Sequence, residues 1–124
     1  MRIATLLLPL ATLVSPALAQ GVPDAAMGKR VFMRCMACHN VAPGAANKIG
    51  PNLFGIAGKK AAAMPGFKYS AALQKSNLKW DDATLDKWLA RPVGLVPGTS
   101  MVFAGLPKPE DRKAVIAYLK KPAR

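Results

Sequence analysis

The stretch Cys35-Met36-Ala37-Cys38-His39 decides how the rest of this chain can fold. Two thiols three positions apart can each add to a vinyl group on one edge of a porphyrin. A histidine directly after the second thiol can then ligate the iron. The sequence contains only 2 cysteines and 1 histidine, and all of them lie in this stretch. The spacing therefore predicts one covalently attached c-type haem; the alternative is a C-x-x-C thiol redox pair beside a chance histidine.

The N-terminal segment predicts export from the cytoplasm. Arg2 precedes an apolar stretch from Ile3 to Val14, and Ala17-Leu18-Ala19 fits a signal-peptidase site. The apolar stretch is shorter than the ~20 residues that a membrane-spanning helix needs. We therefore expect residues 1–19 to be a cleaved secretory signal peptide and residues 20–124 to form one soluble domain in the bacterial periplasm. An uncleaved N-terminal anchor is the alternative.

Composition narrows the possible partners. The formal net charge of +12 favours anionic partners. Nucleic acid is not expected for an exported protein, which leaves acidic proteins or an anionic membrane surface. A domain of this size buries a thin core, and no further cysteine is available for a structural disulfide. A bound haem would supply the missing apolar area, and we expect a monomer.

The residue pattern predicts an all-α fold of about four helices joined by long loops, with no convincing strand. Asp24 can cap the first helix and Ser70 the second, and Pro92 stops the third. Glycine inside a helix lowers its stability, so we expect Gly28 to be there because it allows another helix to approach closely. The loops over residues 41–58 and 93–107 contain several Pro and Gly residues and lack a period, so we expect them to wrap around the haem. The predicted helices cover residues 25–35, 70–74, 81–90 and 109–121.

If His39 fills one axial position of the iron, three alternatives remain for the other: it is open, it holds water, or a protein atom fills it. With no second histidine, lysine and methionine remain as protein ligands. Met64 and Met101 lie in loops that could reach the face opposite His39, and the rigid turn Pro97-Gly98-Thr99 favours Met101. A neutral thioether stabilises iron(II) and blocks the iron, which leaves one-electron transfer. An open site would instead favour a haem peroxidase or a gas-binding protein. Three other methionines lie on or beside the attachment helix: Met27, Met33 and Met36.

Several other motifs follow one another along the chain. They are Gly28-Lys29-Arg30-Val31-Phe32, Gly50-Pro51-Asn52-Leu53, Pro65-Gly66-Phe67-Lys68-Tyr69-Ser70, Trp80-Asp81, Pro97-Gly98-Thr99-Ser100-Met101-Val102-Phe103-Ala104-Gly105 and Ile116-Ala117-Tyr118-Leu119. With these motifs in this order, the chain resembles a class I cytochrome c of the mitochondrial and alphaproteobacterial type. The likeness extends over almost the whole of residues 20–124.

The resemblance implies a role for each of several residues. Met101 would be the distal ligand, and the carbonyl of Pro51 would accept the ring proton of His39. Tyr69 and Trp80 would hydrogen-bond a buried haem propionate. The first and last helices would cross at a steep angle. The chain departs from the family at Trp88 (usually tyrosine), Lys59 (often arginine) and Leu73 (often asparagine).

The function that the resemblance implies is one-electron transport without enzymatic activity. A quinol-oxidising cytochrome complex would be the donor and a terminal oxidase the acceptor. A photosynthetic reaction centre or a periplasmic dehydrogenase is equally compatible. We expect acidic partners to meet a basic rim around an uncharged centre. The rim would consist of Arg34, Lys48 and Lys108, and the centre of residues 93–96 and Ser100.

Overall fold

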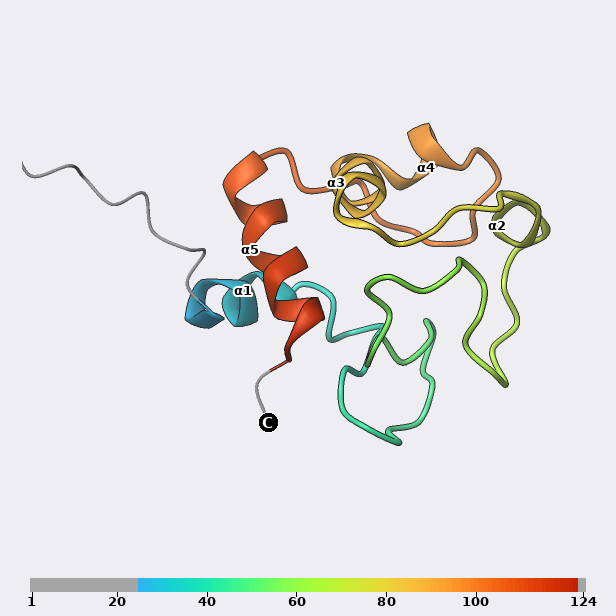
Figure 1. The fold of residues 1–124 in the computed structure, drawn as a ribbon. Coiled ribbons are helices and arrows are strands. Elements are labelled where there is room, and N and C mark those ends of the chain that lie inside the picture. The colour runs from blue at the N-terminus through green and yellow to red at the C-terminus, as the bar shows by residue number, and fades with distance from the viewer. Residues whose placement is uncertain (1–24, 123–124) are drawn as a thin grey trace, which may run out of the picture.

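The computed structural model describes residues 25–122, and within them the chain forms five helices and one isolated β-bridge (Figure 1). The all-α prediction is therefore confirmed. The predicted signal peptide and the Asp24 cap lie outside the described residues. None of the described helices is both long and apolar enough to cross a membrane. The helices are α1 (Ala25–Phe32), α2 (Ala71–Lys75), α3 (Asp82–Ala90), α4 (Pro92–Leu95) and α5 (Pro109–Lys120).

The first helix ends at Phe32, before the haem motif. The predicted helix over residues 25–35 extended to the first cysteine of that motif and was therefore too long. The amide of Cys35 donates to the carbonyl of Phe32 at 2.8 Å, and the amide of Arg34 donates to that of Val31 at 3.1 Å. These bonds span three residues, so the helix tightens into turns after Phe32. The haem motif therefore lies on a tight turn that continues from α1.

Side-chain caps begin two of the helices. The hydroxyl of Ser70 accepts from the amide of Leu73 at 3.2 Å, as expected for the start of α2. A carboxylate oxygen of Asp81 accepts from the amide of Thr84 at 2.8 Å. Asp81 is therefore the N-cap of α3. The predicted bounds, residues 81–90, had made it the first residue of the helix.

The short helix α4 was not predicted. Pro92 was expected only to stop the preceding helix, but it also occupies the first turn of α4. Proline fits there because a helix start leaves its first amides unpaired in any case. The prediction of a continuous loop over residues 93–107 was therefore wrong for its first three residues.

The close crossing of α1 and α5 brings the two ends of the domain together (Figure 1). A Cβ atom on Gly28 would lie 2.5 Å from the carbonyl oxygen of Ala114 and 2.7 Å from the Cβ of Tyr118. The ring of Phe32 packs on that of Tyr118 with 5.4 Å between their centroids. The expectation that Gly28 allows another helix to approach closely is confirmed. The crossing holds the haem motif beside the C-terminal helix.

Candidate haem site

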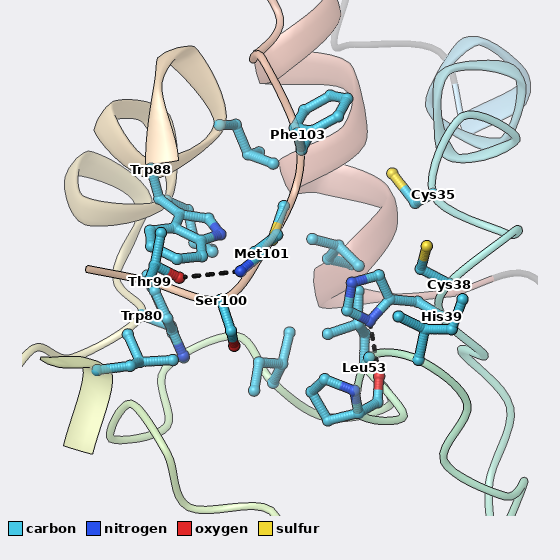
Figure 2. A pocket seen from close by; sticks show the side chains of 18 of the residues that line it. Cys35, Cys38, His39, Leu53, Trp80, Trp88, Thr99, Ser100, Met101 and Phe103 are labelled. Carbon is cyan, nitrogen blue, oxygen red and sulfur yellow. Dashed lines mark hydrogen bonds between the residues drawn. The ribbon is translucent and has the colours of Figure 1, made fainter. Parts of the chain in front are cut away.

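A cavity of about 240 Å³ lies between the haem motif, α3, α5 and the loops (Figure 2). Close-packed protein interiors rarely contain voids larger than a water molecule. An apolar space of this size therefore suits a large flat group such as a porphyrin. Its apolar wall includes Phe32, Leu53, Ile56, Leu73, Leu85, Trp88, Leu89, Val115 and Leu119.

Cys35 and Cys38 both line this cavity, and their sulfur atoms lie on the same side of it as His39 (Figure 2). The amides of Cys38 and His39 donate to the carbonyl of Cys35 at 3.1 and 2.9 Å, which closes the turn. Burial raises the pKa of the Cys35 thiol more than the neighbouring Arg34 guanidinium lowers it. The Cys35 thiol is therefore neutral at neutral pH, and the turn presents both cysteine side chains to one edge of the cavity.

The imidazole of His39 has its orientation and its tautomer fixed by one hydrogen bond. Nδ1 lies 2.7 Å from the carbonyl oxygen of Pro51. A carbonyl only accepts, so Nδ1 carries the proton and Nε2 keeps its lone pair. Burial lowers the pKa of His39, although the Pro51 bond opposes this, and the ring is therefore neutral at neutral pH. A neutral imidazole with a free Nε2 is the form that ligates a metal.

Gly50 is a second determinant of the imidazole position. A Cβ atom on Gly50 would lie 2.6 Å from Nδ1 and 2.8 Å from Nε2 of His39. Any side chain at this position would therefore push the ring away. In the sequence, Gly50 is noted only as part of the motif Gly50-Pro51-Asn52-Leu53, and its contact with His39 was not predicted. The signal that could have revealed it is a glycine directly before Pro51, whose carbonyl accepts the hydrogen bond of the imidazole.

Asn52 fixes the loop that carries Pro51, and this role was not predicted from the sequence either. Its side chain is 5% exposed and donates to the carbonyls of Ala42 and Ala45 at 2.8 and 3.0 Å. Its side-chain oxygen accepts from the amide of Phe54 at 3.0 Å. The buried amide therefore holds together the loop whose Pro51 carbonyl orients His39.

Met101 lines the same cavity as His39 and lies across the open space from it (Figure 2). Its own amide donates to the Thr99 hydroxyl at 3.3 Å. Met64 lines a separate hollow, and Met33 and Met36 are 65% and 52% exposed. The structure thus brings Met101, and not these other methionines, to the cavity that the imidazole faces.

Tyr69 and Trp80 also line the cavity. The Tyr69 hydroxyl accepts from the amide of Met64 at 3.2 Å, which leaves its own proton free to donate. Burial raises the pKa of Tyr69, so the phenol stays protonated. Trp80 is 5% exposed, and its ring packs on that of Trp88 with 5.2 Å between centroids. Taken with the thiols, imidazole and thioether, these residues fit a c-type haem.

Residues 25–122 match the family described as Cytochrome c. The chain belongs to this family. A cytochrome c2 from Rhodomicrobium vannielii is 49% identical over 109 residues, which cover 88% of this chain and 87% of that protein. The cytochrome c2 iso-2 of Magnetospirillum fulvum is 54% identical over 89 residues, which cover 72% of this chain and 92% of that protein. The solved structure of cytochrome cH from Methylobacterium extorquens matches with a TM-score of 0.74 and 48% sequence identity. The match covers 78% of this chain and 97% of that chain.

These similarities confirm the predicted class I cytochrome c of bacterial type and the small all-α cytochrome c fold. They also confirm that the protein carries one covalently bound haem c, which suits the C-x-x-C-H stretch at Cys35, Cys38 and His39. At the level of its family and named relatives, the protein is an electron-carrier cytochrome and not an enzyme.

Proposed function

We propose that this cytochrome is a soluble periplasmic one-electron carrier whose haem iron is ligated by His39 and Met101. The observation that carries the proposal is that both side chains line one cavity from opposite sides. When bound, the haem supplies the Fe(III)/Fe(II) couple. His39 offers Nε2 because Pro51 holds its Nδ1 proton. A neutral thioether opposite it favours the reduced iron and excludes substrates from the metal.

The other residues of the cavity would attach and orient the group. Cys35 and Cys38 would hold its vinyl edge through two thioether bonds. Tyr69 has a free hydroxyl proton, and Trp80 has a ring N–H to donate; both suit a haem propionate. The apolar wall, including Leu73 and Trp88, would keep water from the iron.

The proposed location and partners rest on charge and on the surface around the cavity. Residues 1–19 would direct export. The net charge of +12 suits acidic redox partners: a quinol-oxidising complex, a terminal oxidase, a reaction centre or a dehydrogenase.

The uncharged centre predicted for the docking surface, residues 93–96 and Ser100, needs one correction. Val93 is 46% exposed, but Val96 is only 4% exposed, so Val96 does not belong to that centre. Ile49, 81% exposed, and the fully exposed Val102 do line the cavity mouth.

Replacement of Met101 by alanine tests the proposed ligation. The Met101→Ala change should open the sixth site, so that the reduced protein binds carbon monoxide and its potential falls. Met64→Ala is the matched control, because Met64 lines a different hollow, and it should change neither property. An absorption spectrum under carbon monoxide measures the first effect and a redox titration the second. If the reduced wild-type protein already binds carbon monoxide, the distal site is open and the carrier proposal fails.

A further inference from the structure

The chain segment that carries Met101 is held at its two ends. Among the described residues, no backbone–backbone hydrogen bond joins residues 100–105 to any other part of the chain. Before the segment, the amide of Thr99 donates to the carbonyl of Val96 at 3.1 Å. After it, the amide of Leu106 donates to the carbonyl of Leu89 at 2.7 Å. The segment is therefore held by these two anchors and by the packing of the half-buried Met101 and Phe103 against the core.

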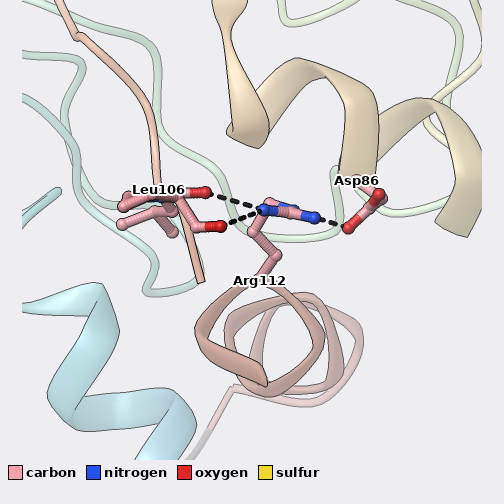
Figure 3. Close-up of polar contacts among 4 residues, drawn as sticks. Asp86, Leu106 and Arg112 are labelled. Carbon is pink, nitrogen blue, oxygen red and sulfur yellow. Dashed lines mark hydrogen bonds and ion pairs between the residues drawn. The ribbon is translucent and has the colours of Figure 1, made fainter. Parts of the chain in front are cut away.

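Arg112 of α5 forms a large part of the second anchor (Figure 3). Its Nη1 donates to the carbonyl oxygens of Leu106 and Pro107 at 2.9 and 3.0 Å. Its Nε donates to a carboxylate oxygen of Asp86 on α3 at 2.7 Å. One guanidinium group thus joins α5, α3 and the end of the segment that carries Met101.

The surroundings of Arg112 make these bonds effective. The Arg112 side chain is only 12% exposed and Leu106 is 1% exposed, whereas the Asp86 side chain is 48% exposed, so the bond to the Leu106 carbonyl is the best shielded of the three. Charge-assisted hydrogen bonds shielded from water are stronger than those at the surface. The planar guanidinium also holds its donors in a fixed fork, which the single ammonium group of a lysine cannot reproduce. Moving the segment outward requires breaking these contacts together with the burial of Leu106.

We propose that Arg112 is a positioning residue that, through Leu106 and Pro107, sets how often Met101 leaves the haem iron. The inference rests on the proposed ligation by Met101. An external ligand binds the iron only while the segment is open. Its apparent dissociation constant equals the intrinsic constant divided by the open fraction. A weaker anchor raises the open fraction and tightens external binding, although the external ligand never touches Arg112.

Imidazole binding to the oxidised haem protein measures this open fraction. In Arg112→Lys the positive charge remains but the fork is lost. The apparent dissociation constant for imidazole should fall about tenfold, equivalent to ~1.4 kcal/mol. Asp86→Asn keeps both carbonyl bonds of Arg112 and removes only the carboxylate charge. It should change the constant in the same direction by about threefold, and it provides a second reading if Arg112→Lys folds poorly.

Lys120→Gln is the matched control for the loss of an ion pair between α5 and α3. The Nζ of Lys120 lies 2.6 Å from a carboxylate oxygen of Asp82, but its side chain is 49% exposed and its hydrogen bond goes to α3 rather than to a carbonyl of Leu106 or Pro107. Its imidazole constant should stay within about twofold of the wild type. If Arg112→Lys lowers thermal stability but leaves imidazole binding unchanged, Arg112 is only structural and the inference is overturned. If Met101→Ala and wild type bind imidazole equally, the ligation itself is wrong.

Discussion

The two walls of the haem cavity are held in place in different ways. On the His39 side, Gly50 donates to the carbonyl of Cys38 at 2.8 Å and Leu53 to that of Asn40 at 2.8 Å, while Pro51 accepts from the imidazole. On the other side, no backbone–backbone hydrogen bond joins residues 100–105 to the rest of the described chain. Segments with few backbone contacts open at lower free energy than those with many. We therefore expect the imidazole to stay in place while the thioether exchanges.

The largest expected effect comes from removing the haem from between the two walls. Cys35→Ala combined with Cys38→Ala removes both attachment points. Leaving the apolar cavity empty would lower the free energy of unfolding by more than the whole stability of a small domain, which is only about 5–15 kcal/mol. We expect a largely unfolded chain with little helical circular dichroism and no cooperative unfolding by urea. In contrast, acid–acetone should leave the haem on the wild-type protein. A cooperative, well-folded apoprotein would contradict this.

Gly50→Ala tests the rigidity of the His39 wall. The new methyl group would overlap the imidazole, so either the ring or the loop must shift. Overpacking of this kind costs about 1–3 kcal/mol. We expect that loss in the free energy of unfolding, measured by urea titration of the haem protein, together with a shift in the haem absorption spectrum.

Gly94→Ala is the matched control for that experiment. The three atoms nearest to a Cβ atom on Gly94, within α4, would all belong to the side chain of Arg91, with the nearest at 3.3 Å. Alanine also favours a helix more than glycine does. Gly94→Ala should therefore leave the haem spectrum unchanged and the stability equal or higher. Equal losses in the two variants would mean that the His39 wall adapts as easily as the surface does.

The sequence was sufficient for features whose signals are local. The haem motif, the Ser70 cap and the close approach at Gly28 each follow from a residue type at its own position. The contact of Gly50 with His39 joins positions eleven apart along the chain through a loop without a period, so no local pattern shows it. The same holds for the bonds of Arg112 to Leu106 and Pro107, because these partners are backbone carbonyl groups, which every residue carries.

The helix α4 was missed for a different reason. Pro92 is a strong stop signal after Ala90, and the same residue also serves as a helix start. A four-residue helix has too few positions to show a period of its own. Only the packing around Pro92, which is among the largest fully buried side chains, shows that the chain turns there and continues as a helix.

The smallest expected effect concerns the first anchor of the Met101 segment. Thr99→Val keeps the β-branched shape and removes the hydroxyl that accepts from the Met101 amide. The bond is long at 3.3 Å and partly exposed, so stability should change by no more than about 0.5–1 kcal/mol. The open fraction should still rise, and the imidazole constant should fall about twofold. Ser100→Ala is the control, because the exposed Ser100 hydroxyl makes no hydrogen bond within the described residues.

Combining Thr99→Val with Arg112→Lys then asks whether the two anchors act independently. Effects of separate sites add in free energy, so the two fold-changes in the imidazole constant should multiply. A double variant that binds imidazole no more tightly than Arg112→Lys alone would show that the Leu106 end controls opening by itself. The contrast between the two walls would then reduce to one contact, the guanidinium of Arg112 on the carbonyls of Leu106 and Pro107.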